Sequence, residues 1–316
     1  MLTDRVGRRL GECGRIVTTP DSLCGPWSES RGTPSAKGDM VLDYMISGSM
    51  AEWSSTAAEH ALRTPRAIVL AAGEGTRLRP LTLDRPKPMV PIDGKPLLEY
   101  TLKWLRGYGI QDVAINLHYR PEVIPHYFGD GSALDLCITY SHEDVILGTA
   151  GAVRKMAGFL NEGPLVVVYG DVLTDLDLGA LLDFHLQTIA RDPSAGVTMS
   201  LYHVSNPTEV GLVGLDDHGR VTCFVEKPKP EEVFTDLANT GVLIIEPNVV
   251  AHIPPNVFYD FGLHLFPQLL QSGVAMYGWV IPDETYLLDI GTLEKYAQAQ
   301  REWPQRCSKC SALPFF

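Results

Sequence analysis

The sequence predicts an α/β fold in which a doubly wound, mixed sheet carries helices on both faces. Several apolar runs have the length and continuity of strands buried on both faces. Stretches with helical periodicity separate these runs. Hydrophobic residues make up 45% of the chain and charged residues 20%, which is ordinary for a soluble globular protein. Such a sheet binds its ligands beyond the carboxyl ends of its strands.

The first half of the predicted fold begins at Arg66, where "RAIVLAA" reads as a buried parallel strand. The helices that follow are marked by apolar residues three and four positions apart. The expected strands are 66–72, 112–117, 135–140, 164–171 and 196–204, and the expected helices are 96–107, 121–128, 149–159 and 178–187.

The second half reads as a β-rich lid built onto the same sheet. Residues 211–228 hold two short strands around an Asp-His-Gly turn, and an apolar run follows at 238–247. A short helix at 263–271 precedes the extended segment 276–292, and a last helix is expected at 292–303.

Three parts are expected along the chain. Residues 1–65 mix Gly, Ser, Thr, Pro and charges without a sustained period, so we expect a flexible extension, with a short helix possible at 44–62. Residues 66–303 form one domain, and 304–316 form a tail. Cys307 and Cys310 make one C-x2-C pair, which is at most half of a zinc site.

Charge and hydropathy limit the partners. The formal net charge of -12 argues against nucleic acid as a partner, because a broad phosphate backbone needs a basic surface. No apolar stretch approaches the roughly 20 residues that span a bilayer, and the N-terminus lacks the apolar centre of a secretion signal. We therefore expect a cytoplasmic protein that does not bind membranes.

A glycine-rich loop follows the first strand. A Walker A loop needs a Gly-Lys-Ser/Thr sequence that begins five positions after Gly73, and a dinucleotide fingerprint needs a third glycine three positions after Gly75. Leu78 stands at this position in both cases, so neither motif is present. A loop remains in which Gly73 and Gly75 let the backbone approach a nucleotide. Thr76 and Arg77 then meet phosphates through backbone donors and a guanidinium fork.

The longer pattern G-x-G-T-R-L-x-P-L-T-x-x-x-P-K-P over 73–88 resembles the signature of the sugar-1-phosphate nucleotidyltransferases. The resemblance continues through "YGD" (169–171), "EKP" (226–228), "ANTG" (238–241) and "LDIGT" (288–292). Within the family, "PKPMVPIDGKPLLEY" and "SHEDVILGTAGAV" look most like GDP-mannose pyrophosphorylases. The resemblance implies a Rossmann-like, glycosyltransferase-A-like fold in which the β lid binds the sugar.

The resemblance also implies the roles of individual residues. Arg77 and Lys87 would bind the triphosphate, Lys227 the sugar phosphate, and Asp171 and Asp289 a Mg²⁺ or Mn²⁺ ion. The expected nucleotide-binding residues are Leu70, Ala72, Gly73, Gly75, Thr76, Glu143 and Gly148, and the expected sugar-binding residues are Gly170, Glu226, Asn239, Thr240 and Gly241.

The implied activity transfers a nucleotidyl group from an NTP to a sugar 1-phosphate and releases pyrophosphate. GTP and mannose 1-phosphate are the expected substrates, and we expect Glu143 to grip the two adjacent donors of guanine with its carboxylate. The alternative for Glu143 is a solvated loop residue. A UTP- or CTP-dependent transferase and a non-catalytic regulatory subunit are the alternatives for the protein, and a homo-oligomer is left open.

Overall fold

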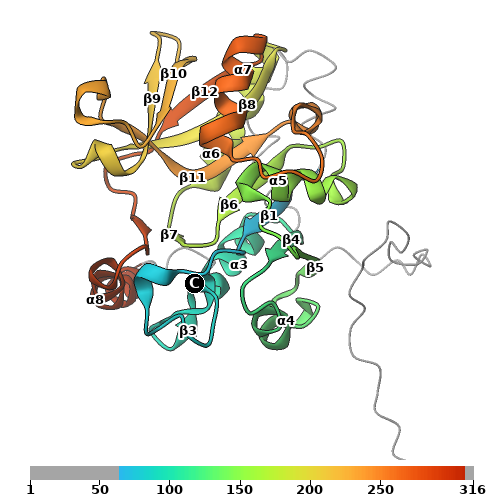
Figure 1. Ribbon diagram of the computed structural model, residues 1–316, viewed down its shortest axis with the longest axis vertical. Helices are drawn as coiled ribbons and strands as arrows, with labels where there is room; N and C mark the ends of the chain where they lie inside the picture. The colour runs from blue at the N-terminus through green and yellow to red at the C-terminus, as the bar shows by residue number, and fades with distance from the viewer. Residues whose placement is uncertain (1–63, 310–316) are drawn as a thin grey trace, which may run out of the picture.

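A computed structural model describes residues 64–309, and its centre is a nine-stranded mixed sheet (Figure 1). The strands run in the order β10-β9-β11-β6-β1-β4-β5, and β8 pairs with both β11 and β12. The sheet comprises β1 (Arg66–Leu70), β4 (Asp112–Leu117), β5 (Cys137–His142), β6 (Leu165–Tyr169), β8 (Ala195–His203), β9 (Gly211–Leu215), β10 (Val221–Glu226), β11 (Leu237–Ile245) and β12 (Ala275–Val280).

Strands β6, β1, β4 and β5 are parallel, so their carboxyl ends share one edge of the sheet. Alternate side chains of β1 belong to different cores: Ala67 and Val69 face one apolar cluster, and Ile68 faces the other. Helices cover both faces: α3 (Leu97–Gly107), α4 (Val123–Phe128) and α6 (Leu178–Arg191) share the first cluster, and α5 (Gly148–Lys155) and α7 (Phe266–Ser272) share the second. The predicted doubly wound α/β fold is confirmed.

The predicted lid is continuous with the sheet. Strand β11 is antiparallel to both β6 and β8, which connects the parallel half to the β9–β10 hairpin and β12 (upper half of Figure 1). The hairpin turns at the Asp-His-Gly sequence, where Asp216 accepts hydrogen bonds from the backbone of His218 and Arg220.

Helix α8 (Leu293–Lys309) lies beside the glycine-rich loop (Figure 1). Its Trp303 is buried, with its ring 5.7 Å from Tyr100 and 5.3 Å from Tyr286. The helix was predicted to end at Trp303, before Pro304, but it continues through the proline to Lys309. Arg306, one turn further, donates to Asp175 at 2.5 Å and provides an anchor beyond the proline.

Several other predicted boundaries were also wrong, and three short strands were not predicted. Helix α6 ends at Arg191 and not at 187, and helix α5 ends at Lys155 and not at 159. Strand β5 begins two residues later than expected because Asp135 is in the left-handed region (φ 54°). A π-helical turn, Phe261–Leu265, precedes α7. The unpredicted strands are β2 (Pro91–Ile92) with β3 (Lys95–Pro96), and β7 (Val172–Thr174). Strand β7 pairs with β13 (Leu287–Asp289), which lies in the expected extended segment 276–292.

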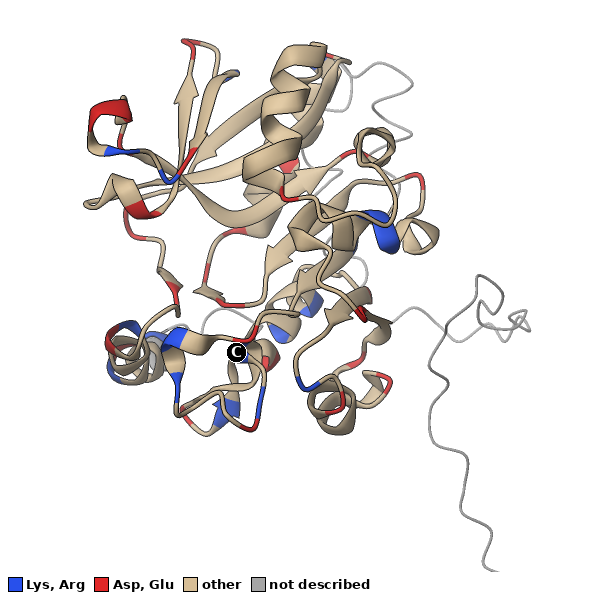
Figure 2. Ribbon diagram, in the orientation of Figure 1, with Lys and Arg blue, Asp and Glu red and all other residues tan. Residues whose placement is uncertain are grey.

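The possible helix at 44–62, nearly all of the extension 1–65, and Cys310 lie outside the described residues, and the division of the chain into parts stays a prediction. Within 64–309 no helix is both long and apolar enough to cross a bilayer. Acidic and basic residues are both spread over the helices and loops of this part in the view of Figure 2.

Candidate active site

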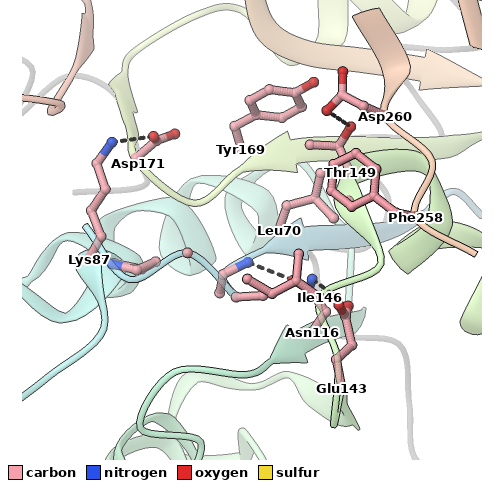
Figure 3. Close-up of a pocket in the computed structure, with 15 residues that line it drawn as sticks. Leu70, Lys87, Asn116, Glu143, Ile146, Thr149, Tyr169, Asp171, Phe258 and Asp260 are labelled. Atoms are coloured by element: carbon pink, nitrogen blue, oxygen red, sulfur yellow. Dashed lines mark hydrogen bonds and ion pairs between the residues drawn. The ribbon is translucent and has the colours of Figure 1, made fainter. Parts of the chain in front are cut away.

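A cavity of about 290 Å³ opens where strands β1, β4 and β6 end. Figure 3 shows Lys87 and Asp171 on one side, Thr149, Phe258 and Asp260 on the opposite side, and Asn116 with Glu143 below. The cavity is lined by Leu70, Ala71, Ala72, Gly73, Lys87, Pro88, Asn116, Glu143, Ile146, Gly148, Thr149, Tyr169, Asp171, Phe258 and Asp260.

The two glycines of the loop have different surroundings. Gly73 lines the cavity, and a β-carbon built on it would have no atom within 4 Å. Gly75 does not line it: its φ is +65°, and a β-carbon there would lie 2.9 Å from Cβ of Lys87. The carbonyl of Gly75 accepts hydrogen bonds from the Thr82 hydroxyl (2.8 Å) and the Leu78 backbone (2.9 Å). Gly73 therefore leaves room for a ligand, whereas Gly75 leaves room for the side chain of Lys87.

Lys87 connects this loop with both predicted metal ligands. It begins a 3-10 turn after the extended Pro86, and Pro88 is the next residue of that turn. The ammonium pairs with the carboxylate of Asp171 and lies 3.4 Å from Oδ1 of Asp289. Only 11% of the Lys87 side chain is exposed. Lys87 thus lies between the two prolines with its ammonium facing the carboxylates, and its contact with a triphosphate stays a prediction.

The short strands β7 and β13 bring Asp171 and Asp289 together. Asp289 pairs with Val172 in the ladder, and the backbone N–H of Ile290 donates to the carbonyl of Asp171 at 2.9 Å. Burial and the charge of Asp171 raise the pKa of Asp289 above its ordinary value, and the ammonium groups of Lys87 and Lys295 oppose that rise. The two carboxylates therefore repel each other and favour a cation between them.

Arg77 and Lys295 add positive charge beside Asp289. A β-carbon built on Gly291 would lie 3.1 Å from Oδ2 of Asp289 and 3.4 Å from Nη2 of Arg77, which places the guanidinium next to this carboxylate. Lys295 Nζ lies 3.7 Å from the same Oδ2. Thr76 is exposed and starts the 3-10 turn that carries Arg77. Arg77 therefore lies near the predicted metal ligand Asp289, its contact with the triphosphate stays a prediction, and Lys295 was not predicted.

The donor set at Asp171 and Asp289 fits a hard divalent ion. Mg²⁺ and Mn²⁺ prefer oxygen ligands, and Mg²⁺ is commonly held by one or two carboxylates together with substrate phosphates and water. Among residues 64–309, no three or more His, Cys, Asp and Glu side chains gather as a metal site. The pair fits an ion that takes its remaining ligands from substrate and water.

Glu143 lies at the wall of the cavity opposite this cluster, with 1% of its surface exposed. Its Oε1 accepts a hydrogen bond from the amide of Asn116 (2.8 Å), and its Oε2 accepts one from the backbone N–H of Leu147 (2.9 Å). The side chain of Asn116 in turn accepts from the backbone of Ala71 (2.7 Å). This burial excludes the alternative that Glu143 is a solvated loop residue. Direct contact between Glu143 and guanine stays a prediction.

A glycine is required at position 148 by the backbone of Tyr259, which packs against it in the fold. Its φ is +73°, and a β-carbon there would lie 2.6 Å from the carbonyl oxygen of Tyr259. The backbone of Tyr259 donates to the carbonyl of Leu147 (2.8 Å) and accepts from Gly151 (2.8 Å). The loop around 257–260 is thereby fixed against the start of α5. Thr149 continues this contact by donating to Asp260 at 2.9 Å.

The predicted sugar-binding carboxylate, Glu226, lies on the lid near Asp260. β-carbons built on Gly211 and Gly262 would each lie 2.7 Å from its Oε2, so these two glycines leave space for the carboxylate. Burial raises the pKa of Glu226, with Lys227 opposing and Asp260 adding to the rise. Lys227 has a left-handed backbone (φ 47°), a 68% exposed side chain, and an ammonium 3.8 Å from Oε1 of Glu226.

The "ANTG" segment contributes to the site in different ways. A β-carbon on Gly241 would lie 3.1 Å from the ring of Tyr169, which lines the cavity. The Asn239 side chain accepts from the backbone of Gly241 at 3.2 Å. Thr240 is buried, and its hydroxyl pairs with that of Ser200 and accepts from the backbone of Val242. The Thr240 hydroxyl is thus used inside the fold, and its contact with a sugar stays a prediction.

Gly170 was expected to let a ligand approach the backbone, but the nearest atoms are those of the chain itself. A β-carbon there would lie 2.7 Å from the carbonyl oxygen of Leu70 and 3.1 Å from Pro88. Its N–H donates to that carbonyl at 2.9 Å. Gly170 therefore allows the ends of β1 and β6 to meet above Pro88.

Several lining residues were not predicted from the sequence. Thr149 and Tyr169 stand inside the quoted motifs "LGTAG" and "YGD", and Asn116 is the one polar residue in the interior of the apolar run "DVAINL". These three signals could have been followed. Ile146 stands inside the quoted motif "SHEDVILGTAGAV", in the loop 143–148 that the resemblance assigns to the base pocket. Phe258 and Asp260 lie in a loop whose sequence carries no comparable signal.

Known proteins resemble this chain both in sequence and in structure. Mannose-1-phosphate guanylyltransferase of Mycobacterium tuberculosis is 41% identical over 248 residues, covering 78% of this chain and 67% of the relative. UTP–glucose-1-phosphate uridylyltransferase of Synechocystis is 38% identical over 247 residues, covering 75% and 62%. The chain thus spans about two thirds of the length of these relatives.

A putative glucose-1-phosphate thymidylyltransferase from Bacillus anthracis has the same fold, with a TM-score of 0.66 and 21% identity over 75% of this chain and 94% of that one. This likeness confirms the nucleotidyltransferase-type, glycosyltransferase-A-like architecture. The nucleotidyl transferase family as a whole matches residues 66–306, which include every residue predicted to take part in the chemistry. The chain therefore belongs to the nucleotidyl transferase family.

Proposed function

We propose that this protein transfers a nucleotidyl group from an NTP to a sugar 1-phosphate and releases pyrophosphate. The arrangement of Lys87 between the carboxylates of Asp171 and Asp289, at the side of a cavity lined by the Gly73 loop, carries this proposal. A reaction between two polyanions needs positive charge to offset the repulsion between the substrates. Lys87 supplies one such charge, and the two carboxylates would hold a divalent ion that supplies more.

The reaction needs positioning more than proton transfer. The attacking phosphate oxygen is already an anion at neutral pH, so no general base is required. Lys87 and Arg77 would bind the triphosphate and stabilise the charge that moves onto the leaving pyrophosphate, which their positions beside Asp289 support. Asp171 and Asp289 would hold Mg²⁺ or Mn²⁺, which supplies further charge stabilisation on the phosphates.

The lid would bind the sugar phosphate. Glu226 is a half-buried acceptor for sugar hydroxyl groups, and Lys227 beside it offers an exposed ammonium for the phosphate. Asn239 accepts a hydrogen bond from Gly241, which packs on Tyr169 at the cavity, and would add a polar group for the sugar. The base would bind at the Asn116–Glu143 wall of the cavity.

GTP and mannose 1-phosphate are the substrates we propose, because the relative at 41% identity and several others are named mannose-1-phosphate guanylyltransferases. The relative at 38% identity uses UTP and glucose 1-phosphate by its name, so a uridylyltransferase is the second candidate. The cytoplasmic location and the oligomeric state stay predictions.

Pyrophosphate release over a matrix of four NTPs and several sugar 1-phosphates tests both candidates. Highest kcat/KM with GTP and mannose 1-phosphate supports the first candidate, and highest kcat/KM with UTP supports the second. Release with no combination, by a folded protein supplied with Mg²⁺, would refute the transferase.

A further inference from the structure

Asn116 and Glu143 connect two walls of the cavity through one chain of hydrogen bonds. The backbone N–H of Ala71 donates to Oδ1 of Asn116 (2.7 Å), and Nδ2 of Asn116 donates to Oε1 of Glu143 (2.8 Å). Oε2 of Glu143 accepts from the backbone N–H of Leu147 (2.9 Å). Figure 3 shows Asn116 and Glu143 pointing toward each other below the cavity.

The two backbone donors are ones that secondary structure leaves unpaired. Ala71 directly follows the last residue of β1, and Leu147 directly precedes α5. Backbone N–H groups at such ends need partners from outside their own element. The pair supplies both partners, and it thereby ties the Gly73 loop to the segment 146–148 across the floor of the cavity.

The direction of every bond in this chain is fixed. A backbone N–H can only donate, so Oδ1 of Asn116 faces Ala71 and its amide nitrogen must face Glu143. Both Glu143 oxygens are acceptors, and both are engaged. The main chain of Glu143 is held as well, since its N–H donates to Leu117 (2.7 Å) and its carbonyl accepts from Nδ1 of His118 (2.7 Å).

We propose that Asn116 and Glu143 form one positioning unit that sets the distance between the two nucleotide-binding walls. In this role the Glu143 carboxylate acts through its two hydrogen bonds and does not read the base. The inference rests on the proposed function, because it assigns the nucleotide to this end of the cavity. It predicts that the pair determines how tightly any NTP binds but does not choose among bases.

A side-chain swap separates positioning from base reading. In Glu143→Gln the new amide places a donor against either Leu147 or Asn116, so one pair of donors is left facing each other. In Asn116→Asp two carboxylates face each other in a buried site. In the double variant Asn116→Asp with Glu143→Gln, the new carboxylate accepts from Ala71 and from the new amide, and the carbonyl oxygen of that amide accepts from Leu147. Every hydrogen bond and the net charge are then restored.

Nucleotide binding is the direct readout, measured by calorimetry on the full chain with GTP and with UTP in Mg²⁺ buffer. Each single variant should raise Kd for both nucleotides by a similar factor, roughly fivefold to a hundredfold, and leave KM for the sugar 1-phosphate unchanged. The swapped double variant should return Kd to within roughly threefold of the wild-type value. Because binding is measured without the second substrate, the test holds even if the protein transfers no nucleotide.

Asp144→Asn is the matched control. It makes the same carboxylate-to-amide change one residue away, at a side chain that is 93% exposed, and it should leave Kd unchanged. A double variant that binds as poorly as Glu143→Gln would overturn the proposal. So would a change in the GTP-to-UTP preference that follows the loss of the carboxylate, since that marks direct base reading. If a single variant does not fold, the proposal still requires that the swapped variant folds and binds.

Discussion

Asp289 lies beside Asp171 because a three-residue strand pairs the segments that carry them and the N–H of Ile290 donates to the carbonyl of Asp171. This places two carboxylates where burial and mutual repulsion raise the pKa of Asp289, with the ammonium of Lys87 as their shared partner. The repulsion between the two carboxylates costs free energy in the protein without substrate or metal ion. The arrangement is suited to a site that receives additional cations with its substrate.

Asp171→Asn and Asp289→Asn should each lower kcat by at least about a hundredfold at saturating Mg²⁺, because each removes a charge that would hold the ion. Steady-state kinetics over a Mg²⁺ titration measure this, with circular dichroism to verify the fold. Asp217→Asn, at an exposed position of the hairpin turn, is the control and should behave as wild type. Full activity of both site variants in a chelator would refute the metal assignment.

Glu226→Gln should increase thermal stability at pH 7 while it lowers activity. Burial, opposed by Lys227 and aided by Asp260, raises the folded-state pKa of Glu226 above the ordinary 4.5. The stability that this carboxyl contributes when neutral is fully present below pH 4.5 and is lost as the pH rises through the folded-state pKa. Gln stays neutral, so the variant avoids that loss.

The difference in Tm between Glu226→Gln and wild type should therefore be largest at neutral pH and should vanish below about pH 4. Thermal unfolding from pH 3.5 to 8 measures it. Glu231→Gln, an exposed change in the same lid, should show no such dependence on pH. A variant that is less stable than wild type at pH 7 would show that Glu226 is stabilised as a carboxylate.

Apolar runs made the central sheet predictable. Strands such as β1 and β6 are continuous apolar runs because the sheet is covered on both faces. The ladder of β7 and β13 was not predictable, since three residues carry too little pattern to identify a strand. The end of α8 was misplaced because Pro304 normally stops a helix, and the anchoring of Arg306 by Asp175 is a tertiary contact.

The site, too, has residues that the sequence predicted and residues that it could not predict. The resemblance brought Lys87, Asp171 and Asp289 to one place, and the structure brings them together. The burial of Glu143 could not be predicted, because its neighbours His142 and Asp144 are charged or titratable and make the loop look solvated. Its partner Asn116 lies far away in the sequence, within an apolar strand. Long-range polar pairs of this kind leave no local pattern.

Gly73→Ala and Gly75→Ala should impair the protein in different ways, the first in NTP binding and the second in stability. Gly75→Ala places a side chain at φ +65° against Lys87, so it should lower the free energy of unfolding by about 1–3 kcal/mol. Gly73→Ala has open space and should leave stability unchanged, but its methyl group projects where a nucleotide would lie and should raise KM for the NTP. Urea unfolding together with NTP kinetics separates the two effects. Equal stability of both variants would contradict the loop geometry.

Arg77→Ala and Lys227→Ala should change different kinetic constants. Arg77 lies beside Asp289, where charge would develop on the leaving pyrophosphate in the proposed reaction, so its loss should lower kcat by roughly a hundredfold with little change in either KM. Lys227 has an exposed ammonium beside Glu226 on the lid, so its loss should raise KM for the sugar 1-phosphate by roughly tenfold or more and spare KM for the NTP. Arg79→Ala and Lys229→Ala, each two residues away and exposed, are the matched controls. If Lys227→Ala lowered kcat and left the sugar-phosphate KM unchanged, Lys227 would act on the reacting phosphates, and the assignment of the lid to the sugar phosphate would have to be withdrawn.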